Sequence, residues 1–182
     1  MNYMRHHSVT MLPGILASLF LLLGTGNLYC STLLQSVYHS AGPGDGYDKL
    51  MILERGEVYI GPLTIPSGVS CCIRGNDAVC SLLNTDILVM SGSSLDISDC
   101  VLYGGHYTLH YQDGADGLIR GNTIYGGVDG VRAVLAQVTI ENNIIANNSG
   151  MGIAVDEDLL PVIQYNDVWN NLGGNYMAFC VG

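Results

Sequence analysis

The chain has 182 residues, of which 48% are hydrophobic and only 12% are charged, so it can bury the core of one folded domain and is not expected to be disordered. Sixteen acidic residues oppose six Lys and Arg, and the resulting formal charge of -10 argues against nucleic acid as a partner because phosphate backbones would be repelled. Twenty-four glycines indicate many tight turns, since glycine adopts left-handed backbone without strain.

The first 26 residues have the pattern of a secretory signal peptide. A basic start at Arg5 precedes a mainly apolar run from Ile15 to Leu23, and small residues around Gly26 offer a cleavage position. The apolar run is too short to span a bilayer, so no membrane span is expected. We expect residues 1–26 to be a signal peptide, residues 27–48 to be an N-terminal linker or cap, and the chain to be secreted, periplasmic or at the cell surface. The alternative is that residues 1–26 form a buried N-terminal helix.

Six cysteines permit disulfides in an exported chain, and their spacing leaves every pairing open. They lie at positions 30, 71, 72, 80, 100 and 180. No Cys-x-x-Cys occurs, which argues against a zinc site built on thiolates.

A nine-residue pattern recurs along residues 49–182. It has the form Ile-x-x-(Asn/Cys)-x-(aliphatic)-x-(Gly/Asn)-(Gly/Asn) and begins at Ile97, Ile119, Ile140 and Ile163, with a weaker copy at Ile73. Successive starts are 24, 22, 21 and 23 residues apart, which is the range of stacked solenoid units.

Each copy predicts two short strands joined by a turn. The first and sixth positions are aliphatic, so Ile97, Ile119, Ile140 and Ile163 are expected to form one buried stack. The third position holds Gly, Asp or Asn in four of the five copies, and these residues tolerate left-handed backbone. The fourth position predicts a structural ladder, in which side chains bond to one another and to turn backbone. Its members are Asn76, Cys100, Asn122, Asn143 and Asn166.

A third strand is expected after each Gly/Asn pair, at residues 108–112, 130–134 and 152–156. Three strands in each repeat predict an all-β fold, a right-handed parallel β-helix of about five to six coils of 21–24 residues that occupies residues 49–182. These repeats, together with the preceding Glu57-Val58-Tyr59-Ile60-Gly61 and Leu63-Thr64-Ile65, resemble the right-handed parallel β-helix repeat proteins of the pectate-lyase-like superfamily. The resemblance implies a fold and not one activity, because that superfamily includes lyases, hydrolases, epimerases and non-catalytic modules.

Residues that serve catalysis in that superfamily do not assemble in this sequence. Its lyases hold calcium with carboxylates, but Asp113 and Asp156, which share a repeat position, lie two coils or roughly 10 Å apart, too far to ligate one ion together. Of the hydrolase motifs only Asn84-Thr85-Asp86 is present, and no carboxylate pair suited to glycoside hydrolysis accompanies it. We therefore expect no catalytic residue, metal or cofactor in this segment. Calcium is the only ion that the resemblance to the lyases implies.

Outward aromatic and basic residues are the better candidates for a binding site. The seventh repeat position holds Val79, Tyr103, Tyr125, Ala146 and Trp169. Aromatic rings exposed on successive coils suit the C–H faces of sugar rings. On the third strand His110 and Arg132 share an outward position, on the sheet that forms the substrate cleft in the enzymes the chain resembles. The predicted carbohydrate-binding residues are Tyr103, Tyr125, Trp169, His110 and Arg132; the alternative is that they only cover the sheet surface.

We interpret the sequence as an exported β-helix module that binds polysaccharide or displays a surface, without catalysis in this segment. Two alternatives stay open: a polysaccharide lyase or glycoside hydrolase that is degenerate or truncated, and a structural adhesin or envelope protein. The last repeat is followed by about one coil and by no polar cap or amphipathic helix, which would leave strand edges open. We expect either that the β-helix continues beyond Gly182 or that this end associates with a partner or a second copy.

Overall fold

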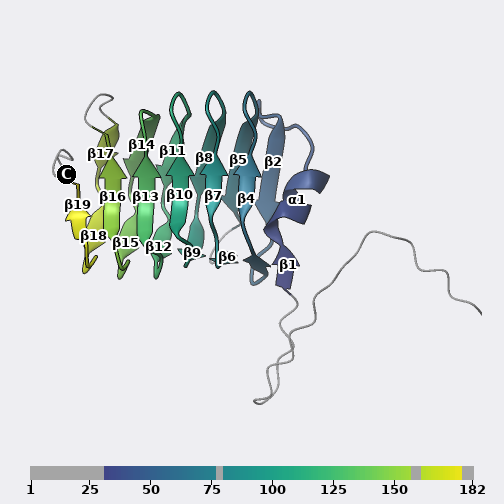
Figure 1. The fold of residues 1–182 in the computed structure, drawn as a ribbon. Helices are drawn as coiled ribbons and strands as arrows, with labels where there is room; N and C mark the ends of the chain where they lie inside the picture. Colours follow the sequence, from purple (N-terminus) through teal and green to yellow (C-terminus); the bar gives the residue numbers. More distant parts are fainter. Residues whose placement is uncertain (1–30, 77–79, 157–160, 178–182) are drawn as a thin grey trace, which may run out of the picture.

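A computed structural model describes residues 31–76, 80–156 and 161–177. The predicted signal peptide and Val79 lie outside these ranges. Within them the chain winds as a parallel β-solenoid whose coils stack in sequence order (Figure 1). The predicted all-β parallel β-helix is confirmed.

Three parallel sheets run the length of the solenoid, and each repeat contributes one strand to each of them. Sheet I consists of β2 (Lys49–Leu53), β5 (Ser70–Gly75), β8 (Ser94–Ser98), β11 (Asp116–Arg120), β14 (Gln137–Glu141) and β17 (Val162–Gln164). Sheet II consists of β1 (Ser31–Leu33), β3 (Val58–Ile60), β6 (Cys80–Leu83), β9 (Cys100–Tyr103), β12 (Thr123–Tyr125), β15 (Ile144–Ala146) and β18 (Asp167–Trp169). Sheet III consists of β4 (Leu63–Ile65), β7 (Ile87–Val89), β10 (Tyr107–Tyr111), β13 (Asp129–Ala133), β16 (Met151–Val155) and β19 (Gly174–Tyr176).

The isoleucine at the start of each repeat lies in register with its neighbours across sheet I. Ile73 pairs with Ile97, and the column continues through Ile119, Ile140 and Ile163. All but the last are completely buried, and Ile163 is partly buried against the same core. Burial of one such side chain stabilises the fold by about 1.5 to 3 kcal/mol, so this column is a main source of stability.

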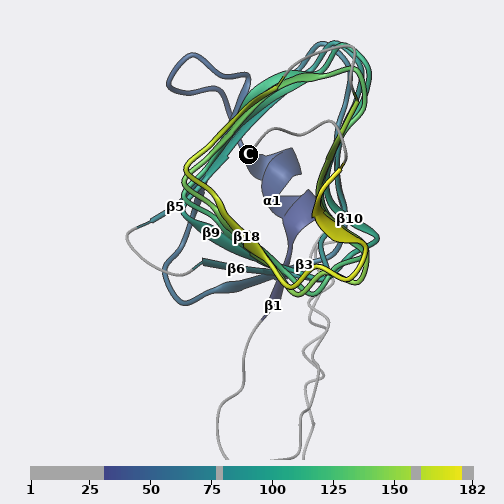
Figure 2. The ribbon, with the colours of Figure 1, turned by 90° about the vertical axis from the view of Figure 1, so that its left-hand side faces the viewer.

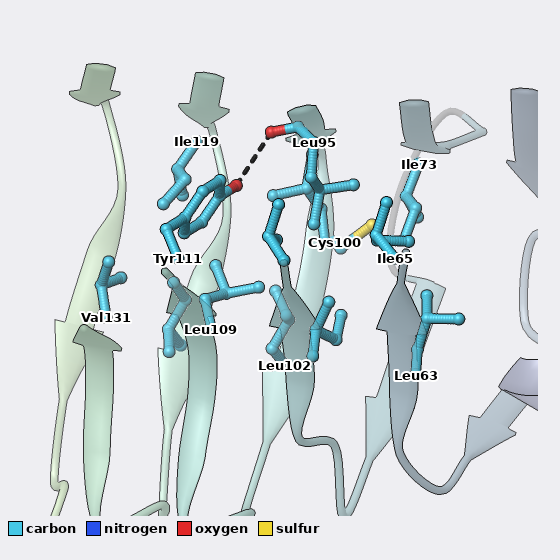
Figure 3. Close-up of a cluster of buried hydrophobic side chains, with 14 of the residues drawn as sticks. Leu63, Ile65, Ile73, Leu95, Cys100, Leu102, Leu109, Tyr111, Ile119 and Val131 are labelled. Carbon is cyan, nitrogen blue, oxygen red and sulfur yellow. Dashed lines mark hydrogen bonds between the residues drawn. The ribbon is translucent and has the colours of Figure 1, made fainter. Parts of the chain in front are cut away.

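Sheets I, II and III together enclose the core (Figure 3). Tyr111 on β10 is the largest fully buried side chain, and its hydroxyl donates a 2.8 Å hydrogen bond to the carbonyl oxygen of Leu95 on β8. A buried hydroxyl without a partner would be costly, so this bond allows a tyrosine to fill the space between two sheets.

Helix α1 (Leu34–Ser40) closes the N-terminal end of the core. It follows β1, buries Leu34 and Tyr38, and lies across the end of the solenoid beside β2 and β4 (Figures 1 and 2). Among the residues that the structure describes, no helix is long and apolar enough to cross a membrane.

The fourth repeat position carries an inward ladder of amides. The side-chain carbonyl of Asn122 accepts the backbone N–H of Cys100, that of Asn143 accepts the N–H of Asn122, and that of Asn166 accepts the N–H of Asn143. Asn122, Asn143 and Cys100 are buried. Each amide thus satisfies a backbone donor of the coil before it, which a buried turn requires.

The first repeat departs from the predicted alignment. Cys80, and not Asn76, lies opposite Cys100 in sheet II, and Asn76 is exposed. Six residues lie between Ile73 and Cys80, whereas two lie between Ile97 and Cys100, so this connection contains four additional residues. Asn76 is therefore not a member of the ladder, and the weaker copy of the pattern is weaker because its turn is longer.

The third repeat position is left-handed in the later coils, with φ of 57° at Asp99, 66° at Gly121, 56° at Asn142 and 57° at Tyr165. Tyr165 adopts this backbone although its side chain does not favour it. Gly75 does not have left-handed backbone. A glycine is required at this position for another reason: a Cβ atom there would overlap the carbonyl oxygen of Asp99 on the next coil.

Candidate functional site

The aromatic row predicted on sheet II is present, with a gap. Tyr103, Tyr125, Ala146 and Trp169 lie in register on β9, β12, β15 and β18. The rings of Tyr103 and Tyr125 are in contact, with centroids 5.0 Å apart and planes tilted by 57°. Tyr103 is 44% exposed and Trp169 46%, whereas Ala146 is buried. Trp169 thus lies two coils, or about 9.6 Å, beyond Tyr125 and does not continue the contact between the two tyrosines.

A pocket of about 370 Å³ lies beside this row, in the turns from sheet II to sheet III. Gly126, Asn147 and Asn170 line it, and they directly follow Tyr125, Ala146 and Trp169 in the chain. All three have left-handed backbone, with φ of 74°, 57° and 52°. Glycine and asparagine adopt this conformation most readily, so the Gly/Asn pair of the repeat builds the concave turn.

The polar lining of the pocket is held in place from below. Asn148 is buried and accepts the backbone N–H of Gly127, while Asn171 accepts the N–H of Asn148, so a second amide ladder runs under the pocket. At the surface the Asn170 amide donates a 2.6 Å hydrogen bond to the side-chain carbonyl of Asn147. Within the described part of the chain, the amide N–H₂ of Asn147 and the carbonyl oxygen of Asn170 have no other partner. A donor and an acceptor are therefore available to a ligand.

Tyr103 connects the aromatic row to the pocket. Its ring packs on Gly126, where a Cβ atom would overlap the Tyr103 ring. Gly126 also lines the pocket, so the row and the amide-lined hollow form one continuous surface, which we call the turn site.

His110 and Arg132 belong to a different surface. They are neighbours in register on β10 and β13 of sheet III. The Arg132 guanidinium lies 5.2 Å from the centroid of the Tyr107 ring, and His110 lies edge-on to the same ring at 4.9 Å. His106 also packs on Tyr107, and the centroids of the two rings are 4.3 Å apart. We call these four planar side chains the sheet III patch.

Burial, and then the nearby Arg132 cation, lower the pKa of His110 from its usual 6.5, so its imidazole is neutral at pH 7. Arg132 is oriented by Asp129, whose carboxylate lies 3.5 Å away and also accepts the backbone N–H of Met151. The patch thus offers a cation, a neutral imidazole and aromatic faces, which can bind polar planar or hydroxyl-rich ligands.

The structure therefore divides the five predicted binding residues between two sheets. Tyr103, Tyr125 and Trp169 lie on sheet II, whereas His110 and Arg132 lie on sheet III, and the two sheets form different sides of the cross-section (Figure 2).

Sequence reasoning missed Tyr107 and Asp129 because it began the third strands one residue too late. The observed strands start at Tyr107, Asp129 and Met151 and not at 108, 130 and 152. It also missed the pocket, although the Gly/Asn pairs that line it were recognised as turns.

One of the remaining sequence candidates has a structural role. Asp86, in the isolated Asn84-Thr85-Asp86 match, accepts the backbone N–H groups of His106 and Tyr107 at 2.6 and 2.9 Å and so supports a turn. Residues 31–76, 80–156 and 161–177 contain no group of three or more His, Cys, Asp or Glu side chains placed to hold a metal ion. Cys71 and Cys72 are free thiols.

Comparison with known proteins agrees with this architecture. Residues 85–180 match the family model described as a right-handed beta helix region. Comparison with curated proteins and with solved structures gave no match. The matched segment covers more than half of the chain and contains the repeats that form the stacked coils, so the chain belongs to the right-handed β-helix family.

Proposed function

We propose that this chain is an exported module that binds polysaccharide at the turn site, without cleaving it. The observation that carries the proposal is the contact pair on sheet II of an exposed Tyr103 and a half-buried Tyr125, which is continuous with a pocket lined by amide and hydroxyl side chains. Sugars present C–H faces that pack on aromatic rings, and hydroxyls that bond to amides.

The arrangement favours an extended glycan that lies along the stack of coils. The row and the pocket both run from coil to coil, so successive sugar units would meet the two tyrosines, the amides and then Trp169. The net charge of -10 favours a neutral polysaccharide over an acidic one. Export is supported by the signal-like pattern of residues 1–26.

A glycan array followed by calorimetric titration of the best-binding polysaccharide tests this proposal. The double variant Tyr103→Ala/Tyr125→Ala should weaken binding at least tenfold, which corresponds to about 1.4 kcal/mol. Tyr165→Ala is the matched control, because Tyr165 is 79% exposed but lies in the turn between sheets I and II. An equal loss of affinity in the double variant and in Tyr165→Ala, or no loss of affinity in the double variant, would show that polysaccharide does not bind at the turn site. An array without hits would favour a structural adhesin or envelope protein.

A carbohydrate-active enzyme is the second candidate, and the sheet III patch favours it. A neutral His110 beside Arg132 could exchange a proton with a bound sugar. Chromatography of the bound polysaccharide after prolonged incubation distinguishes the two: shortened chains that disappear with His110→Ala would establish cleavage, and unchanged chain length would support binding alone.

A further inference from the structure

A second hollow, of about 250 Å³, lies on the outer face of sheet I, away from the turn site. Two outward columns on β5, β8 and β11 form it. One column holds Cys72, Asp96 and Leu118, and the other holds Arg74, Ser98 and Arg120. Tyr47, from the loop before β2, and Asp99, from the turn after β8, complete the walls.

The carboxylate in the centre of this pocket is fixed by two donors. The Tyr47 hydroxyl donates to one oxygen of Asp96, and the backbone N–H of Leu118 donates to the other at 2.9 Å. The hydrogen bond to Asp96 raises the pKa of Tyr47 to about 12, so Tyr47 remains a hydroxyl donor over the whole physiological range. The loop before β2 is thereby held against sheet I and closes one side of the pocket.

Both guanidiniums are held by carboxylates outside the pocket. Arg74 contacts Asp45 at 3.3 Å and the Cys72 sulfur at 3.7 Å. Arg120 donates to Glu141 at 2.6 Å, and Gln164 holds the other oxygen of Glu141 at 2.8 Å. The two arginines are thus placed one coil to either side of Ser98, whose hydroxyl has no hydrogen-bond partner among the described residues.

The charges that line the pocket balance. Two guanidiniums and the carboxylates of Asp96 and Asp99 line it, and burial raises the pKa of the Cys72 thiol, which stays uncharged at neutral pH. An anion would be repelled by the carboxylates and a cation by the guanidiniums. A hydroxyl group both donates and accepts, so a ligand with several hydroxyls satisfies both kinds of group at once.

We propose that this pocket binds one neutral pyranose unit, with its hydroxyls bonded to Arg74, Ser98 and Asp99 and its C–H surface against Leu118 and the Tyr47 ring. The volume is below the usual range of sites for drug-sized ligands, so it accommodates a single ring and not an oligosaccharide. The site is distinct from the turn site and does not depend on the function proposed for it.

The test is an NMR titration of the folded chain with glucose, galactose and mannose, with sodium glucuronate and sodium sulfate as anionic probes. At least one neutral hexose should shift the backbone amide resonances of residues 96–99. Arg74→Gln and Ser98→Val should weaken that binding at least tenfold. Arg55→Gln is the matched control, because Arg55 is exposed and does not line the pocket.

Three outcomes would overturn the proposal: no shift with any hexose, tighter binding of glucuronate or sulfate than of every hexose, or undiminished hexose binding in Arg74→Gln. Arg74 is a half-exposed surface residue, so its variant remains decisive even if Ser98→Val fails to fold. The double variant Tyr103→Ala/Tyr125→Ala should retain hexose binding here, which separates failure of this site from failure of the turn site.

Discussion

The amide ladder gives the sharpest prediction, the replacement of Asn143 by Leu. The Asn143 side chain makes five hydrogen bonds. Its carbonyl accepts the backbone N–H of Asn122 and the Asn122 amide, and its N–H₂ donates to the carbonyls of Ile119 and Glu141 and to Asn166. Leu removes all five and leaves the buried N–H of Asn122 without an acceptor.

The expected cost follows from these contacts. The orphaned N–H costs about 1 to 3 kcal/mol. The larger Leu side chain adds about 1 to 3 kcal/mol of overpacking in a site where Asn143 is 1% exposed. The additional apolar burial offsets about 1 kcal/mol. We therefore expect a net loss of about 1 to 5 kcal/mol, which for a chain of this size lowers Tm by roughly 2 to 20 °C.

Circular dichroism melts and urea titrations of both purified variants measure this loss. Asn76→Leu is the control, because the sequence pattern places Asn76 in the same ladder whereas the structure leaves it exposed. Its Tm should stay within about 1 °C of the parent, as exposed substitutions usually do. Equal Tm values for the two variants would show that the ladder reasoning is wrong, and a large loss in Asn76→Leu would restore the original alignment.

The other predictions concern the core, pH dependence and the turn site. Ile140→Asp buries an unpaired carboxylate and should cost at least about 4 kcal/mol, whereas Ile144→Asp, exposed on the same coil, should cost far less; similar melts would contradict the core register. Because the folded state lowers the pKa of His110 below 6.5, stability should be fully present above that pH and decline as the pH falls through the folded pKa, and His110→Gln should reduce this decline in melts between pH 7.5 and 5. Gly126→Ala should displace the Tyr103 ring and weaken polysaccharide binding, measured by calorimetry, by more than its loss of stability, measured by Tm, would explain. Unchanged affinity would show that the Tyr103 ring and the pocket do not act together.

The repeat pattern was sufficient to predict the columns of the core. Strand side chains alternate between the two faces, and stacked coils place equivalent positions over one another, so Ile97, Ile119 and Ile140 had to share a column once the period was recognised. The same logic predicted that Tyr103 and Tyr125 stand on adjacent coils, because both hold the seventh repeat position; the structure adds that their rings are in contact.

Irregularities in the coils were decided only by the tertiary structure. The longer turn after Ile73 shifts Cys80 into the place predicted for Asn76, because pairing with the next coil, and not spacing along the chain, sets the register. Likewise, the strand starting at Tyr107 was missed by one residue, and with it the aromatic partner of His110 and Arg132.

The sequence alone thus determined the coil, its period and the residues that face inward, because these follow from a pattern that repeats every 21 to 24 residues. The pockets required the folded chain. The turn site joins side chains from successive coils, and the sheet I pocket depends on Tyr47, which reaches Asp96 from 49 residues away. Such sites arise where side chains from different coils meet, and only the packing of the coils brings those side chains together.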